Sequence, residues 1–161
     1  MLYLARRYGD AERQLRSTLE RDPTFAYAWS TLALVLLQEH RSSEAIAAWR
    51  RALALEGEHS WAGYLAYLGY AYAVTGQPDS ARAILRALRD PHARRYLSSV
   101  AIELVQLGLG ERDSAFASFT RAIDESDAFV VNGNGFPADP LFDALRSDPR
   151  YPALLKRENL H

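Results

Sequence analysis

The sequence contains no cysteine among its 161 residues, which excludes disulfide bonds, thiolate metal sites and a cysteine nucleophile. Lysine is almost absent as well, with Lys156 the only one, so the basic residues are nearly all arginine. With the abundance of alanine, this bias indicates a high-GC bacterial genome. The net charge of -1 provides no general attraction to nucleic acid or to an anionic membrane.

A long hydrophobic run is also missing. Residues 60–78 carry no formal charge, but four tyrosines, three glycines and a threonine make the stretch amphipathic, which argues against a membrane span. We expect it to be a buried helix. Residues 1–7 do not form a signal peptide, because the apolar part is short and is followed by Arg6 and Arg7. We therefore expect no membrane insertion and a cytoplasmic location.

No arrangement of side chains points to catalysis. The four histidines are scattered over turns and the terminus, and none pairs at the i, i+4 spacing of metal ligands. The serines have no positioned base, and no glycine-rich phosphate loop follows a strand. We therefore expect no enzyme activity, no cofactor and no metal.

Residues 26–55 contain two amphipathic helical patterns. Apolar residues recur at helical spacing in Trp29-x-x-Leu32-Ala33-x-x-Leu36 and again in Ala45-x-x-x-Trp49-x-x-Ala52. The polar break at 40–43 separates them and predicts an antiparallel helix pair. We expect Ser42 or Ser43 to cap the second helix, with Glu44 in its first turn and Trp49 filling the space toward the next pair.

The pattern repeats along the whole chain. The small residue that opens each second helix is Ala11, Ala45, Ala81 and Ala115, with separations of 34, 36 and 34 residues. Four positions later the larger residue is Leu15, Trp49, Leu85 and Phe119. Several columns in one register indicate a repeat protein, because one helix pair cannot bury both of its faces.

This register resembles the tetratricopeptide repeat (TPR), whose W-x-x-L-G-x-x-Y…A-x-x-x-F…P pattern has a period of about 34 residues. The resemblance implies an all-α fold, a right-handed superhelical array of antiparallel helix pairs over residues 1–126. Counting back from Ala11 puts the beginning of the first helix before residue 1. We therefore expect a truncated first repeat, three further repeats and a chain cut from a longer protein.

The C-terminal part allows a narrower resemblance. The run from Phe142 to Tyr151, together with segments beginning at Tyr96 and Leu109, looks like the C-terminal TPR segment of many bacterial signalling proteins. In that group it follows a serine/threonine kinase, a nucleotide cyclase or a winged-helix DNA-binding domain. We expect residues 127–161 to form a loop and two capping helices, over 141–146 and 150–158, that cover the last repeat. For residues 132–135 we favour a flexible loop over a hairpin turn.

The resemblance implies that the first helices line a concave groove. The positions facing it are Tyr27, Ser30, Leu34, Leu37, Gln38, Gly63, Ala66, Tyr70, Ala73, Val74, Leu97, Val100, Leu104, Leu107 and Gly108. They are nearly uncharged, and the basic clamp of chaperone-binding TPR proteins is absent. We therefore expect the groove to bind an apolar or amphipathic segment of a protein or peptide partner. Alternatively, the same residues form a core covered by the C-terminal tail or by a second copy of the chain.

Three functions remain open at this point. The first, which we favour, is a non-catalytic protein-interaction module in a bacterial signalling or regulatory protein. The second is a self-association module that forms homo-oligomers, and the third is a sensor domain for a small hydrophobic ligand. Nucleic-acid binding is not expected, because Arg82, Arg86 and Arg89 share an outward helix face without interleaved aromatic residues.

Overall fold

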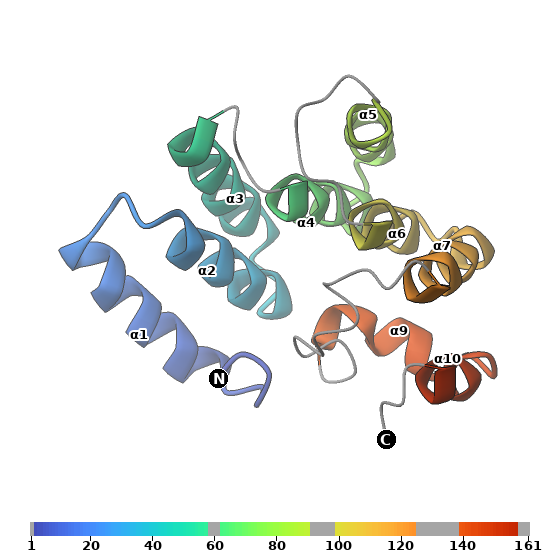
Figure 1. Ribbon diagram of the computed structural model, residues 1–161. Helices are drawn as coiled ribbons and strands as arrows, with labels where there is room; N and C mark the ends of the chain where they lie inside the picture. Colours follow the sequence, from blue (N-terminus) through green and yellow to red (C-terminus); the bar gives the residue numbers. More distant parts are fainter. Residues whose placement is uncertain (1, 58–61, 91–98, 125–138, 158–161) are drawn as a thin grey trace.

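The computed structural model describes residues 2–57, 62–90, 99–124 and 139–157, and every regular element in these ranges is helical (Figure 1). The longer helices are α1 (Tyr8–Arg21), α2 (Ala26–Gln38), α3 (Ser42–Glu56), α4 (Ala62–Val74), α5 (Pro78–Leu88), α6 (Ser99–Gly108) and α7 (Arg112–Asp124). They are followed by the 3-10 turn η2 (Pro140–Phe142) and by the short helices α9 (Asp143–Arg146) and α10 (Tyr151–Arg157). The predicted all-α class is confirmed for these ranges. None of these helices has the length and apolar content that crossing a membrane requires.

The helices pack as antiparallel pairs that follow one another along the chain (Figure 1). The first helices of the pairs are α2, α4 and α6, and the second helices are α3, α5 and α7. α1 packs against α2, α3 packs against α4, and α4 contacts α6 of the next pair as well as its own partner α5. Each pair thus buries its apolar faces between its neighbours, as the period of the sequence predicts.

One turn recurs four times with the spacing of the repeat. A residue with left-handed φ follows each of the first helices α2, α4 and α6, and another lies at the same register position in the N-terminal turn. These residues are Arg6 (57°), His40 (61°), Gly76 (77°) and Gly110 (78°). The N–H group of the following residue donates to the carbonyl five positions back, in Arg7 to Leu2, Arg41 to Leu36, Gln77 to Tyr72 and Glu111 to Gln106, at 2.8–2.9 Å. This bond closes the last turn of a helix around a left-handed residue. The repeat register therefore holds at the level of single hydrogen bonds.

The expected cap of α3 was wrong. Arg41 is the N-cap residue and Ser42 is already helical, with no side-chain bond capping the helix. The recurring turn explains the difference, because Arg41 follows the left-handed His40 directly and its carbonyl accepts the hydrogen bond from the N–H of Ala45. Glu44 does lie in the first turn, where its carboxylate pairs with the guanidinium of Arg41 at 2.8 Å.

Trp49 joins two helix pairs in the core. Its indole N–H donates a 3.2 Å bond to the hydroxyl oxygen of Ser30 in the same pair. Its ring stacks against Tyr67 of α4, with the ring centroids 6.0 Å apart. The side chain is fully buried, so the expectation that Trp49 fills the space between the pairs is confirmed.

The C-terminal helices pack against the second helix of the last pair. Phe142 meets Phe119 of α7 edge to face, with the ring centroids 5.5 Å apart, and Leu145 is fully buried. Arg150 lies over the ring of Phe116 and forms an ion pair with Asp113 at 2.8 Å. The expected boundary at residue 126 and the expected loop at 132–135 lie outside the described residues.

Two residues of the C-terminal cap, Asp139 and Asp143, also form hydrogen bonds with the N-terminal turn (residues 2–7). The sequence did not predict these contacts. The hydroxyl of Tyr3 donates to Asp139 Oδ1 at 2.8 Å, and the guanidinium of Arg6 donates two bonds to the carboxylate of Asp143, at 2.8 and 2.9 Å. Segments from the two ends of the chain therefore lie side by side (Figure 1).

Candidate binding pocket

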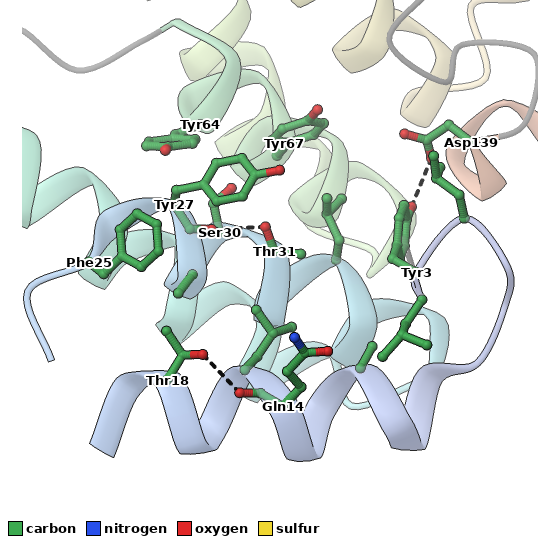
Figure 2. Close-up of a pocket in the computed structure, with 16 residues that line it drawn as sticks. Tyr3, Gln14, Thr18, Phe25, Tyr27, Ser30, Thr31, Tyr64, Tyr67 and Asp139 are labelled. Carbon is green, nitrogen blue, oxygen red and sulfur yellow. Dashed lines mark hydrogen bonds between the residues drawn. The ribbon is translucent and has the colours of Figure 1, made fainter. Parts of the chain in front are cut away.

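A cavity of about 650 Å³ lies where the N-terminal turn, α1, α2 and α4 meet the start of the cap (Figure 2). Its walls are formed by Leu2, Tyr3, Leu4, Ala11, Gln14, Leu15, Thr18, Phe25, Tyr27, Ala28, Ser30, Thr31, Leu34, Tyr64, Tyr67 and Asp139. Most of these side chains are apolar or aromatic. The volume falls within the range of about 300–1,000 Å³ that is usual for ligand pockets.

The pocket is open because α1 has no full helix over one of its faces. In the complete pairs, the residues equivalent to Leu15 are buried beneath a first helix: Trp49, Leu85 and Phe119. Leu15 itself is only half-buried. Thr18 is half-buried too, whereas its counterparts Ala52 and Leu88 are buried. α1 therefore has the contact face of a second helix, and the turn formed by residues 2–7 covers only the Ala11 end of that face.

The serine and threonine hydroxyl groups in the walls are already used within the protein. Thr18 Oγ1 donates to the carbonyl of Gln14 at 3.0 Å, and Thr31 Oγ1 donates to the carbonyl of Tyr27 at 2.9 Å. The hydroxyl of Ser30 accepts the bond from Trp49. Because these bonds satisfy the hydroxyl groups, the walls present a mainly apolar surface to an occupant.

Aromatic side chains gather at one end of the pocket (Figure 2). Phe25 and Tyr27 remain 44% and 56% exposed, and their rings lie 6.0 Å apart. Tyr64 from α4 faces them, and burial raises the pKa of its hydroxyl to about 12, with the charge of Glu56 adding to the effect. Exposed aromatic rings beside a cavity are typical anchors for a binding partner, because they supply large contact area at low entropic cost.

Asp139 marks the opposite end and is the only charged side chain among the described residues of the lining. Its Oδ1 atom accepts bonds from the hydroxyl of Tyr3 at 2.8 Å and from the N–H of Leu141 at 2.9 Å. Burial raises the pKa of this carboxyl above its usual value of 3.8, although both hydrogen bonds and the charge of Arg146 oppose the shift. The pocket thus runs from an aromatic end to an end with one partly buried carboxylate.

The residues predicted for the groove differ in burial, and only some of them line the pocket. Tyr27, Ser30 and Leu34 line the pocket. The buried residues outside it are Leu37, Gly63, Ala66, Val100, Leu104 and Leu107, and the half-buried ones are Gln38, Tyr70, Ala73 and Gly108. Val74 is exposed, and Leu97 lies outside the described residues. Burial of so many of these residues favours the core alternative for that set, and their role in binding stays a prediction.

The pocket residues that the prediction missed come from α1, the N-terminal turn, Asp139 and positions in or next to α2 and α4 outside the predicted groove set, including the aromatic residues Phe25, Tyr64 and Tyr67. The register did contain a signal for α1, because Ala11, Leu15 and Thr18 occupy the columns that contact a first helix. No pattern in the sequence indicated Asp139, whose position depends on how the cap folds back.

Two further features considered in the sequence do not contribute to this pocket. Arg82 and Arg86 on α5 and Arg89 at its C-cap are exposed, as expected, and Arg82 lies 3.6 Å from the carboxylate of Asp79. Within the ranges that the structure describes, no three histidine, aspartate or glutamate side chains group as metal ligands would.

Comparison of the chain with protein-family models, with curated proteins and with solved structures gives no match.

Proposed function

We propose that this chain is a non-catalytic interaction module of the TPR type, and that its pocket binds an amphipathic helix of a partner protein. The incompletely covered face of α1 carries the proposal. Leu15 and Thr18 stand in columns whose other members, as far as the structure describes their side chains, are buried, yet here they line a cavity. A helix placed in this cavity would bury them in the same way.

The recurring turn supports the same position for the occupant. Residues 2–7 repeat the helix-ending hydrogen bonds found at the ends of α2, α4 and α6. The occupant would lie over α1 in line with this turn, as a first helix lies over its second helix. Laying an amphipathic helix into an apolar groove is a common mode of peptide recognition, with anchors spaced at i, i+3, i+4 and i+7.

The pocket limits the length of the contact. Along α1 it extends from Ala11 to Thr18, which at 1.5 Å per residue corresponds to about 10 Å, or about two helical turns. The occupant needs a small residue facing Ala11 and larger apolar residues facing Leu15 and the aromatic end. The resemblance of the C-terminal part to bacterial signalling proteins supports a place in a signalling or regulatory protein.

Fluorescence anisotropy with a labelled synthetic peptide tests the proposal. The peptide, about 14 residues long, carries apolar residues at the spacing of Leu32, Ala33 and Leu36 and polar residues elsewhere. We expect saturable binding, and we expect Leu15→Glu to weaken it by about tenfold or more, because the substitution places a charge in the contact face.

The matched control is Val74→Glu. Val74 is an exposed apolar residue from the predicted groove, but it does not line the pocket, so its substitution should leave the affinity unchanged. Circular dichroism and urea unfolding of both variants separate loss of binding from loss of folding. Equal effects of the two substitutions would contradict a site at α1.

A small apolar ligand is a second candidate, which the cavity volume of about 650 Å³ favours. If the pocket binds such a ligand, small hydrophobic molecules should raise the melting temperature of the protein, and the helical peptide should not bind. A second copy of the chain is the remaining possible occupant. In that case light scattering would show a concentration-dependent dimer, and Leu15→Glu would make the protein monomeric.

A further inference from the structure

We infer that the bound helix runs antiparallel to α1 and brings a positively charged side chain in its last turn to Asp139. This inference rests on the proposed function, and it names the orientation and the charge of the partner segment.

The orientation follows from the repeat. Each first helix runs antiparallel to the second helix of its pair, so an occupant in the first-helix position over α1 ends where α1 begins. Figure 2 shows what lies at each end: Phe25 and Thr18 lie at one end of the pocket, and Tyr3 and Asp139 lie at the other. The first turn of the occupant would therefore meet the aromatic end, and its last turn would meet the carboxylate.

Asp139 has acceptor capacity left for such a partner. Both of its recorded hydrogen bonds end on Oδ1, and within the described ranges no donor reaches Oδ2. Asp139 also forms no ion pair with any side chain in these ranges, whereas the nearby Asp143 is paired with both Arg6 and Arg146. A cation in the pocket would thus meet a carboxylate whose charge no residue in the described ranges has paired.

The surroundings favour a positive charge in two further ways. The hydroxyl-bearing rings of Tyr3, beside Asp139, and of Tyr67, between the two ends, line the pocket, and aromatic faces attract cations. The last turn of any helix carries unpaired carbonyl groups and a partial negative charge, which a lysine or arginine there offsets. Burial also raises the pKa of Asp139, and a nearby positive charge would oppose that shift.

Three peptides with one apolar face, each about 14 residues long, test the inference by fluorescence anisotropy. The first has lysine in the last turn, the second has norleucine there, and the third has the lysine moved to the first turn. We expect the first to bind about tenfold more tightly than either of the others, as a charge-assisted hydrogen bond would produce. These comparisons use the unmodified protein, so they do not depend on a variant that folds.

Asp139→Asn should remove the preference for lysine in the last turn. An asparagine at this position can still accept the bonds from Tyr3 and Leu141, and it also serves well as a helix N-cap. Asp79→Asn, on the exposed face of α5 and far from the lining, is the matched control and should retain the preference.

Equal affinities of the three peptides would overturn the inference and leave the proposed function in place. Tightest binding of the peptide with lysine in its first turn would also overturn it, since the helix would then run the other way. Binding of none of the peptides would remove the proposed function, and the inference with it.

Discussion

Tyr3 and Asp139 stand 136 positions apart in the sequence and share a 2.8 Å hydrogen bond between the phenol oxygen and carboxylate Oδ1. The bond joins the turn before α1 to the residue that directly precedes η2. Tyr3 is buried, and both residues line the pocket. One contact thus helps to close the chain on itself and shapes one end of the candidate binding site.

Replacement of Tyr3 by phenylalanine should lower the free energy of unfolding by about 2 kcal/mol, because a buried hydrogen bond to a charged group is lost. Urea unfolding measures the change. Tyr27→Phe is the control, since Tyr27 is mostly exposed and its hydroxyl forms no recorded bond in the described residues. Similar stabilities of the two variants would show that the Tyr3 bond contributes little.

The pKa values of two carboxyl groups, those of Asp139 and Asp148, should be shifted in opposite directions. Burial raises the pKa of Asp139 above 3.8, whereas hydrogen bonds from the Arg150 side chain and backbone lower the pKa of Asp148 to about 2. NMR titration of the side-chain carboxyl carbons should resolve both midpoints. In Tyr3→Phe the midpoint of Asp139 should move higher still, because the lost hydrogen bond favours the charged form.

The two pKa shifts make the stability of the protein depend on pH in opposite ways. Between 3.8 and its folded pKa, Asp139 binds more protons in the folded protein than in the unfolded chain, so its contribution falls as the pH rises through this window. The stabilisation from Asp148 is present above its unfolded pKa and is lost as the pH falls toward about 2. The charged groups that act on Asp139 are Arg146 and Asp143. A midpoint of Asp139 at or below 3.8 would contradict the burial seen here.

The repeat register predicted the local structure well because it reflects contacts between neighbouring helices. The positions of Ala45, Ala81 and Ala115 follow from helical spacing and the period, and all three are fully buried in the structure. The same period explains why His40 takes a left-handed conformation that its residue type disfavours, since the turn recurs there with Gly76 and Gly110. Local propensity was the weaker guide, as the expected cap at Ser42 or Ser43 shows.

The site was harder to predict because it depends on segments distant in sequence. The contact between Asp139 and Tyr3 depends on the packing of the segment that also places Phe142 against Phe119, and a single polar residue at each end leaves no periodic signal. The predicted groove came from the first helices alone. The register placed positions such as Leu104 in the groove, but it could not show that the surrounding structure buries them.

The left-handed residue at position 40 provides a test of the recurring turn. His40→Gly should raise the free energy of unfolding by about 1 kcal/mol, because glycine adopts this φ without steric cost. Gly110→Ala should lower it by about 1 kcal/mol for the opposite reason. A Cβ atom at Gly110 would have no neighbour within 4 Å, so the backbone conformation alone decides the effect. If both variants unfold at the wild-type denaturant concentration, the turns do not hold these conformations in solution.

Gly69 lies where α4 packs closely against both α5 and α6. A Cβ atom there would lie 2.7 Å from Val105 Cγ2 of α6 and 2.9 Å from Ile84 Cγ2 of α5. Both neighbours are buried and cannot move away freely. Gly69→Ala should therefore lower the free energy of unfolding by about 1–3 kcal/mol through overpacking, even though alanine is the better helix former.

The same substitution at Gly9 in α1 should act in the other direction. A Cβ atom at Gly9 would have only Arg13 Nη1 as a neighbour, at 3.8 Å, so the gain in helix propensity should raise stability by about 0.5–1 kcal/mol. Urea unfolding of the two variants isolates packing from propensity, because both exchange glycine for alanine inside a helix. If Gly69→Ala stabilised the protein as Gly9→Ala does, α4 and α6 would have to lie farther apart in solution, and the antiparallel pairs would be more loosely joined than the structure shows.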